Sequence, residues 1–370
     1  MRLEKLNLIN FRNYEEAELH FHERVNVFLG RNGSGKTNLL DAIYYLSFTK
    51  SAFSTSEQQI IRTGQNYFVV KGNFHLAGQP TREVVASAQS GAKKIFREDQ
   101  RDYDKLSDHI GKYPVVIMTP DDTDLIREGS EYRRRFFDGI ISQLDRRYLE
   151  DLMAYGHVLR QRNGLLKMSF ETGRFDALAL EAYDRLLIKY GEYLHSARKQ
   201  FLKDFLPLFL SHFKGIVAEP EDPVISYASD LNESAFAEGL ARSLSKDRAL
   251  QRTCFGIHRD DYSFLLKGGE IRRTGSQGQQ KSFVIALKLA QYYVIRQQKG
   301  FDPILLLDDI FDKLDDERIN ALVQLLRESD GQIFITDARP HRTSEILANI
   351  GVPGKTFHVA HGTVNSQQSS

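Results

Sequence analysis

The chain has 370 residues, which is enough for two or three folded units and a large core. Lys and Arg number 50 against 49 Asp and Glu, so the net charge of +1 excludes a chain that is basic overall and leaves only local basic patches. The single cysteine, Cys254, excludes an intramolecular disulfide and a cysteine-cluster zinc site. No stretch has the roughly 18 consecutive apolar residues of a membrane span, and the N-terminus lacks a signal-peptide pattern. We therefore expect a cytoplasmic protein without a membrane partner.

Residues 1–118 predict a mixed α/β lobe. Short strand patterns alternate with polar or glycine-containing turns over 3–11, 18–21, 25–29, 68–76 and 83–88. The strand pattern at 25–29 leads into GRNGSGKT, and apolar residues then recur at helical spacing from Thr37 to Leu46. A glycine-rich loop therefore joins a strand to a helix.

This loop has the phosphate-binding spacing G-x-x-x-x-G-K-[ST]. Without Cβ atoms its backbone can turn N–H groups inward around a phosphate, at the positive end of the helix that follows. Lys36 would reach the β and γ oxygens of a nucleotide and assist catalysis, and the Thr37 hydroxyl would hold Mg²⁺. The alternative is an ordinary glycine-rich turn, which the strand-to-helix context disfavours. The predicted nucleotide-binding residues in this segment are Gly30, Arg31, Asn32, Gly33, Ser34, Gly35, Lys36, Thr37 and Asn38.

Residues 119–250 predict a helical lobe. Apolar residues near heptad spacing indicate one long amphipathic helix over 140–159, and Arg162-Asn163-Gly164 is expected to break the pattern. A second long helix over 175–213 would complete an α-hairpin, whose leucine and tyrosine stripes we interpret as packing surfaces and not as a cofactor site. The acidic stretch 219–238 is expected to be a surface connection.

Residues 251–370 return to an α/β pattern, so the helical lobe is expected to be inserted into one ATPase lobe. Strand patterns at 262–266 and 304–307 lie on either side of a strong helix at 280–298, and a short polar tail begins at Asn365. The run FDPILLLDD, residues 301–309, predicts a buried parallel strand that ends in carboxylates at the ligand-binding edge of a sheet. Asp308 is the candidate Mg²⁺ ligand, and Asp309 is the candidate catalytic residue that orients or deprotonates water. Taken alone, the acidic pair fits a helix cap equally well.

The segment GSQGQQKS, residues 275–282, supplies a third element. It matches the L-S-G-G-Q signature of ABC ATPases, and Ser276, Gly278 and Gln279 would bind the γ-phosphate presented by a second copy of the chain, where Ser276 would also assist catalysis. The alternative for Ser276 is a polar helix cap. Asp315 lies where this class carries its D-loop, and the strand pattern at 333–335 ends at Thr336 and Asp337. A kinase or small GTPase would not carry this set in this order, so the ABC class is favoured.

These segments together resemble the RecF family, the bacterial recombination and replication-repair ATPases related to SMC proteins. The matching pieces are NFRNY at 10–14, GRNGSGKTNLLDAIYYL, TPDDTDLIREGSEYRRRFFD at 119–138, LRQRNGLLK at 159–167, GIHRDD at 256–261, SQGQQKS and LLLDDIFDKLD. The resemblance implies an α/β, ABC-type ATPase head with a mixed sheet and a helical second lobe between Walker A and the signature. Lys36 and Asp308 are 272 positions apart (308 − 36), which is far too few for the coiled-coil rod of an SMC protein.

The resemblance also implies a homodimer that sandwiches two ATP molecules, with Lys36, Thr37 and Asp308 of one subunit facing Ser276 of the other. Arg12 would contact the nucleotide. The alternative, to which we give equal weight, is that Arg12 only forms a surface salt bridge. Three positions depart from the general ABC pattern: Asp309 replaces a glutamate, Asp121 and Asp122 stand where a Q-loop glutamine is expected, and Thr336 replaces the switch histidine. Slow hydrolysis is therefore expected, and we expect DNA to stimulate it.

DNA binding and partners follow from the resemblance. The family's role implies an ATP-gated clamp on duplex DNA near single-strand gaps, working with RecR and RecO to load RecA. Candidate phosphate contacts are Arg133, Arg134, Arg135, Arg146, Arg147, Arg160 and Arg162, unless they pair with Glu128, Glu131 and Asp138 or lie on a solvated face. Two alternatives stay open: an SMC-like structural chromosome protein, and the ATPase subunit of a membrane transporter.

Overall fold

The computed structural model describes residues 1–217, 221–311, 314–339 and 351–368. The chain divides into two compact units, each discontinuous in sequence. The first comprises Met1–Asp122, Gly215–Ala218 and Ile285–Ser370, and the second comprises Thr123–Lys214 and Glu219–Val284. The first boundary lies after Asp122, close to the expected 118. The second differs from the expected 250, because residues 251–284 belong to the second unit.

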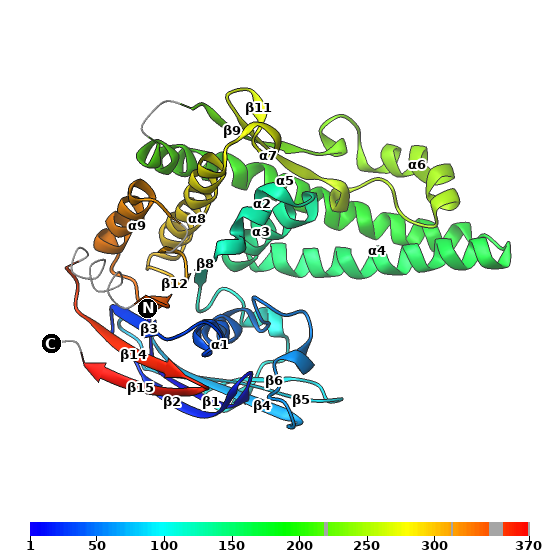
Figure 1. The fold of residues 1–370 in the computed structure, drawn as a ribbon. Helices are drawn as coiled ribbons and strands as arrows, with labels where there is room; N and C mark the ends of the chain where they lie inside the picture. The colour runs from blue at the N-terminus through cyan, green and yellow to red at the C-terminus, as the bar shows by residue number, and fades with distance from the viewer. Residues whose placement is uncertain (218–220, 312–313, 340–350, 369–370) are drawn as a thin grey trace. The chain divides into compact units, whose positions relative to one another are not determined.

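Two six-stranded sheets form the framework of the first unit (Figure 1). The antiparallel sheet has the spatial order β2 (Tyr14–His20), β1 (Arg2–Phe11), β4 (Tyr67–His75), β5 (Arg82–Gln89), β6 (Ile95–Glu98) and β7 (Arg101–Asp102). The mixed sheet has the order β15 (Thr363–Gln368), β14 (Gly354–Ala360), β3 (Val25–Leu29), β13 (Ile333–Asp337), β12 (Ile304–Asp308) and β8 (Val115–Met118). Its strands are parallel except for β15, which pairs antiparallel with β14.

Helix α1 (Lys36–Phe48) packs against strands of both sheets. Phe28 of β3, Leu39 of α1 and Phe334 of β13 are fully buried in one apolar cluster with residues of the antiparallel sheet. Every residue of β3, β12 and β13 is buried, as expected for parallel strands covered on both faces. The carboxyl ends of these three strands therefore lie on a rigid central platform.

The second unit is mainly helical. Its helices are α2 (Asp124–Arg127), α3 (Ser130–Leu144), α4 (Arg146–Thr172), α5 (Ala177–Ile216), α6 (Phe236–Leu250) and α7 (Ile271–Thr274). A small antiparallel sheet has the order β11 (Gly269–Glu270), β10 (Asp261–Leu266) and β9 (Pro223–Ala228). Helix α8 (Gln277–Lys299) begins in the second unit and ends in the first, which also contains α9 (Asp316–Glu328). None of the helices that the structure describes is long and apolar enough to span a membrane.

Helices α4 and α5 form the expected α-hairpin, which is held by polar contacts as well as apolar ones (Figure 1). Arg162 Nε donates to Asp184 Oδ1 at 2.6 Å, and Tyr193 Oη donates to Asp145 Oδ2 at 2.6 Å. Near the base of the hairpin, the buried guanidinium of Arg198 bridges Asp138 and Asp260. Removing one partner of a buried ion pair costs several kcal/mol, so these contacts hold α5 against α3 and against the segment before β10.

The prediction of a single helix over 140–159 is wrong. Helix α3 ends at Leu144, and the Asp145 side chain accepts the Tyr148 N–H at 3.0 Å as the N-cap of α4. The expected break at residues 162–164 is also wrong, because α4 continues to Thr172 and ends at Gly173, whose φ is +70°. Tertiary contacts of the buried Arg162 override the weak helix propensity of Gly164.

Two polar segments that were expected to be irregular form strands. The segment 219–238 contains β9, and α6 begins near its end. Ile225 and Phe236 are buried, so each of these elements has an apolar anchor in the core. The tail from Asn365 belongs to β15 as far as Gln368 and pairs with β14. An edge strand needs only backbone partners, so the polar composition of the tail gives no strand signal.

Candidate nucleotide site

The glycine-rich loop lies between β3 and α1, as predicted. Gly33 and Gly35 have φ angles of +77° and +115°, a region that residues with a Cβ rarely adopt. A Cβ on Gly35 would lie 2.5 Å from Asn13 Nδ2, and Tyr14 Oη donates to the Gly35 carbonyl at 3.0 Å. Asn13 and Tyr14 of the NFRNY segment therefore pack against the loop at Gly35.

Helix α1 begins without a side-chain cap and without an acidic residue in its first turn. Its first N–H groups and its dipole are therefore arranged to receive an anion. Lys36 is 3% exposed, and its Nζ donates to the carbonyls of Gly30 and Arg31 at 3.0 and 3.3 Å. The lysine is thus folded back along the loop that would surround a phosphate.

Asp308 ends β12 beside the first turn of α1. Thr37 Oγ1 donates to Asp308 Oδ1 at 2.8 Å, so the two predicted Mg²⁺ ligands are in direct contact. A hydroxyl and a carboxylate are hard oxygen donors of the kind that Mg²⁺ takes together with substrate phosphates, and the pair fits that ion. Burial raises the pKa of the Asp308 carboxyl, opposed by hydrogen bonds from Thr336 and Thr37. Elsewhere in the described residues no cluster of three or more His, Cys, Asp or Glu side chains forms a metal site.

Asp309 follows directly and is one third exposed. Its Oδ2 lies 3.9 Å from Lys36 Nζ, and its φ of +43° is in the left-handed region. The predicted catalytic residue is therefore next to the predicted phosphate lysine, on the same edge of the sheet. Lys36, Thr37, Asp308 and Asp309 are brought together from segments that are 272 positions apart.

Arg12 is anchored and not freely exposed. Its Nη2 donates to Asp41 Oδ2 at 2.8 Å and to Ser51 Oγ at 3.0 Å, and its Nη1 donates to the Gln59 carbonyl. Asp41 is fully buried in α1. Sequence reasoning missed Asp41, although a carboxylate in the apolar run of this helix was a usable signal.

The signature segment begins α8 in the second unit. Ser276 Oγ accepts the Gln279 N–H at 3.2 Å, and Gln279 Oε1 accepts the Ser276 N–H at 2.8 Å, which is a reciprocal capping box. Ser276 is therefore a helix cap, as the alternative interpretation expected. Ser276 is exposed, so its cap does not remove it from reach of a second molecule. Gly278 lies in the first turn of the same helix.

Two further predicted positions have structural partners. Asp315 is the N-cap of α9 and accepts the Arg318 N–H at 3.2 Å. Asp122 contacts Lys288 Nζ at 2.7 Å, and that amine also donates to the Ile117 carbonyl at 2.8 Å. Lys288, which the sequence did not single out, thus ties the Q-loop position to α8. In contrast, Asp121 is exposed.

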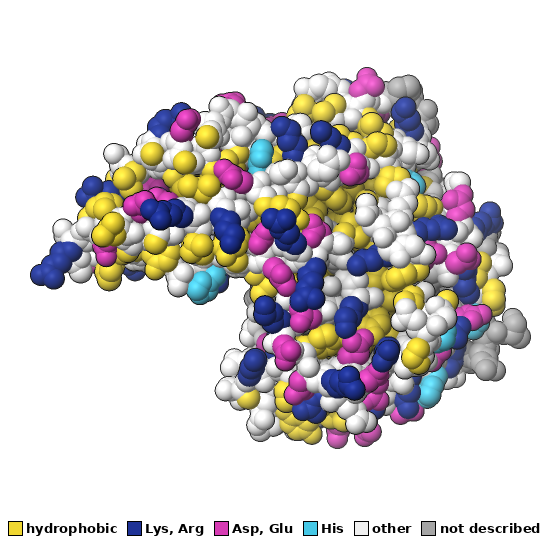
Figure 2. All heavy atoms as spheres, turned by 180° about the vertical axis from the view of Figure 1, so that it is seen from behind, with side chains coloured by type: hydrophobic (Ala, Val, Ile, Leu, Met, Phe, Trp, Pro, Cys, Tyr) yellow, Lys and Arg dark blue, Asp and Glu magenta, His cyan; other side chains and the backbone are white. Residues whose placement is uncertain are grey.

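The arginines proposed for DNA divide into two groups. Arg162 is fully buried with Asp184 and Asp247, and its proposed DNA contact is therefore wrong. Arg133 pairs with Asp261 and Arg134 donates to the Asp260 carbonyl. The exposed group is Arg135, Arg146, Arg147 and Arg160, of which the first three pair with Glu131, Glu150 and Asp151. On the face shown in Figure 2, basic side chains are interspersed with acidic ones.

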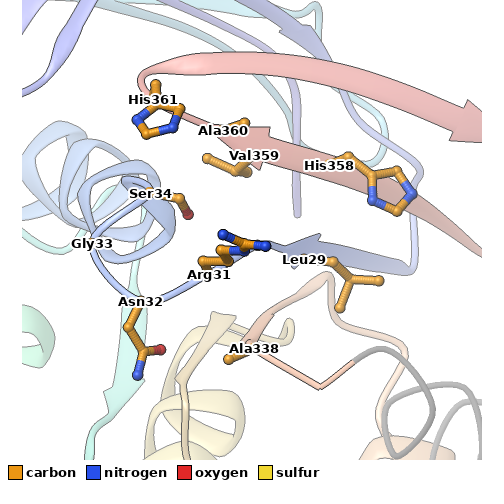
Figure 3. A pocket seen from close by; sticks show the side chains of 11 residues that line it. Leu29, Arg31, Asn32, Gly33, Ser34, Ala338, His358, Val359, Ala360 and His361 are labelled. Carbon is orange, nitrogen blue, oxygen red and sulfur yellow. The ribbon is translucent and has the colours of Figure 1, made fainter.

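A pocket of about 590 Å³ borders the outer side of the glycine-rich loop. Figure 3 shows Arg31 among the lining residues, with Val359 and His361 of the β14–β15 hairpin on one side and Ala338 on the other. A Cβ on Gly30 would lie 2.3 Å from the Val359 carbonyl oxygen, so the hairpin packs tightly against the loop. Neither Lys36 nor Asp308 lines this pocket, which is therefore separate from the predicted metal edge.

The chain is similar to known proteins over almost its whole length. A family model described as the RecF/RecN/SMC N-terminal domain matches residues 2–358. The chain is 44% identical to the DNA replication and repair protein RecF of Cytophaga hutchinsonii, over 100% of this chain and 98% of that protein. It is 44% identical to the protein of the same name from Flavobacterium johnsoniae, over 97% of this chain and 100% of that protein.

Solved structures give the same result for the fold. One, described as the recombination mediator protein RecF-ATPrS in the RecFOR pathway, has a TM-score of 0.89 and 28% identity and covers 99% of this chain and 98% of that one. The Smc head domain of Pyrococcus furiosus, bound to the C-terminal domain of ScpA, has a TM-score of 0.57 and 17% identity. It covers 100% of this chain and 96% of that one, and bears on the fold alone. The expected ABC-type ATPase fold is confirmed.

Proposed function

The chain belongs to the RecF/RecN/SMC N-terminal domain family, and we propose that it is an ATP-dependent DNA-binding protein of recombinational repair and replication restart. It functions in DNA replication and repair, like the RecF relatives that it matches over their full length. Its proposed activity is hydrolysis of ATP to ADP and phosphate. We propose that it acts in the cytoplasm, where bacterial DNA lies.

One observation carries the ATPase proposal: Lys36, Thr37, Asp308 and Asp309 converge at one edge of a buried parallel sheet. The loop N–H groups and Lys36 would bind the β- and γ-phosphates. Thr37 and Asp308 would hold Mg²⁺, which supplies positive charge against the phosphates. Asp309 would orient the attacking water. With one carbon fewer than glutamate, its carboxylate has a shorter reach, and we propose slow, DNA-stimulated hydrolysis.

We propose that two subunits close on two ATP molecules. Ser276 is exposed and Gly278 and Gln279 are partly exposed at a helix N-terminus, which suits the γ-phosphate held by a partner subunit. Closing would clamp duplex DNA near a single-strand gap, and hydrolysis would reopen the clamp. RecR, RecO and RecA are proposed partners from the family resemblance.

For DNA, the exposed arginines of α3 and α4 are the proposed contacts. Arg135, Arg146 and Arg147 each form an exposed ion pair with a neighbour on the same helix, and Arg147 also lies over the Tyr193 ring. Exposed ion pairs of this kind contribute little stability and can be exchanged for phosphates. Binding through phosphates is independent of sequence and sensitive to salt. It would suit a protein that recognises a DNA structure.

The test measures dimerisation, binding to gapped DNA and ATP hydrolysis on the same samples, with and without ATP and Mg²⁺. Lys36→Ala should abolish ATP-dependent dimerisation and DNA binding, and Ser276→Arg should retain ATP binding but not dimerise. Asp309→Asn should lower hydrolysis by about 10²-fold or more and keep the dimer on DNA. Thr274→Arg, which adds the same charge two positions before Ser276, is the matched control for Ser276→Arg.

Dimerisation with ATP but no DNA binding at low salt would leave the ATPase assignment intact and contradict the repair clamp. Dimerisation that Ser276→Arg leaves unchanged would contradict the sandwich arrangement. If the wild type bound no ATP, the whole proposal would fail.

A further inference from the structure

Thr336 connects the two acidic residues of the candidate site. It is the fourth residue of β13 and is fully buried, with Asp308 of β12 as its backbone neighbour on one side and Phe28 of β3 on the other. It therefore lies between the strand that ends in the acidic pair and the strand that leads into the phosphate loop.

The Thr336 hydroxyl makes two well-placed hydrogen bonds. Oγ1 donates to Asp308 Oδ1 at 2.8 Å and accepts the Asp309 N–H at 2.8 Å. A hydroxyl has one proton to donate, so with that proton on Asp308 the contact to Asp309 is through the backbone N–H. Asp309 Oδ1 is farther away, at 3.5 Å.

This contact stabilises an unusual backbone conformation. Asp309 has a φ of +43°, which is unfavourable for a residue with a Cβ and persists only where the surroundings hold it. The hydrogen bond from its N–H to Thr336 supplies such a restraint at the end of β12. In this conformation the Asp309 carboxylate lies 3.9 Å from Lys36 Nζ.

Asp308 has two hydroxyl donors on the same oxygen, Thr37 and Thr336. Under the proposed function, Thr37 gives its hydroxyl oxygen to Mg²⁺. Thr336 would then be the remaining hydroxyl donor to Asp308 and would keep the carboxylate oriented. Removing a hydrogen bond to a metal-ligating carboxylate commonly lowers metal affinity or activity by about 10- to 100-fold.

We propose that Thr336 is a positioning residue whose hydroxyl fixes the Asp308 carboxylate and the Asp309 backbone together, so that metal binding and hydrolysis both depend on it. It stands where the ABC pattern has a histidine, yet in this structure it contacts the two aspartates. The proposal rests on the proposed ATPase function.

The test compares Thr336→Val, which removes the hydroxyl at nearly constant shape, with Thr336→Ser, which keeps it. Binding of a fluorescent ATP analogue is titrated with Mg²⁺, and kcat and KM are measured separately. Thr336→Val should raise the Mg²⁺ concentration at half-saturation about 10-fold and lower kcat about 10- to 100-fold. Metal-free binding of the analogue should stay within about 2-fold of wild type. Thr336→Ser should restore both quantities to within about 3-fold of wild type.

Ile335→Val, one position earlier in the same buried strand, is the packing control and should leave both quantities unchanged. A folded Thr336→Val with wild-type Mg²⁺ dependence and kcat would overturn the proposal. So would a Thr336→Ser that is as defective as Thr336→Val, or an equal loss in Ile335→Val. Failure of the wild type to bind the analogue would instead show that the proposed ATPase function is wrong, and this inference with it.

Discussion

At the scale of single residues, the candidate site depends on side chains outside the motifs. Asp41 accepts hydrogen bonds from Arg12, from Ser51 and from the Ala52 N–H, while remaining fully buried. It thus holds Arg12 at a φ of +56° beside the start of α1. A buried carboxylate with this many donors is a structural anchor for the residue predicted to contact the nucleotide.

Asp41→Ala should therefore destabilise the protein by about 3 to 5 kcal/mol, because it leaves the partly buried Arg12 guanidinium without its counter-charge. Urea unfolding measures this loss, and nucleotide binding should weaken in parallel. The matched control is Asp330→Ala, which removes an exposed partner of Arg24 and should cost less than about 1 kcal/mol. Equal losses in the two variants would contradict the anchoring role of Asp41.

The motifs themselves could be predicted from sequence, while their supporting partners could not. The spacing of Gly30, Lys36 and Thr37 is local, so it can be read directly from the chain. Asp41 and Lys288 contribute through contacts between distant segments. The apolar run around Asp41 was a local signal for that residue, but the partners of Asp41 and Lys288 cannot be read from the chain. The choice between exposed and buried arginines likewise depended on tertiary packing, since Arg160 and Arg162 are two positions apart and differ completely in exposure.

At the scale of elements, α4 shows where local propensity and tertiary structure disagree. The predicted break contained Gly164, yet the helix continues through it, with Arg162 bound to Asp184 and Asp247 and Asn163 accepting the Thr253 N–H. The start of the same helix depended on the cap at Asp145, which an apolar pattern does not reveal. Helix boundaries were therefore the least predictable part of the fold, and the buried parallel strands were the most predictable.

Gly164→Ala should stabilise the second unit by about 0.5 to 1 kcal/mol, because it reduces the backbone entropy of the unfolded chain. A Cβ at this position would meet no other atom within 4 Å. Gly239→Ala is the matched comparison on α6, where the added Cβ would lie 2.0 Å from the Phe255 ring, and it should be destabilising. Thermal unfolding distinguishes the two, and destabilisation by Gly164→Ala would show that α4 is strained at this point.

At the scale of the whole molecule, each unit contains a histidine shielded from water: His109 is fully buried and His258 is partly buried. His109 Nε2 donates to the Leu46 carbonyl at 2.6 Å in the first unit, and His258 Nε2 donates to the Thr253 carbonyl at 3.0 Å in the second. Burial, which disfavours the charged ring, lowers the pKa of each to about 4, opposed by these hydrogen bonds. Both units therefore hold a neutral histidine that an unfolded chain would protonate more readily.

The sign of the pH effect follows from this difference. Between an unfolded pKa near 6.5 and a folded pKa of about 4, the unfolded state binds more protons, so stability falls as pH falls through this range. The full stabilisation is present above about pH 7, and each histidine accounts for a loss of up to about 3 kcal/mol on the acidic side.

The urea midpoint should therefore drop between pH 7 and pH 5. His109→Gln and His258→Gln should each flatten that dependence, and the double variant should flatten it further, because the two sites lie in different units and act independently. An unchanged slope in both single variants would assign the acid sensitivity to titratable groups other than these two histidines.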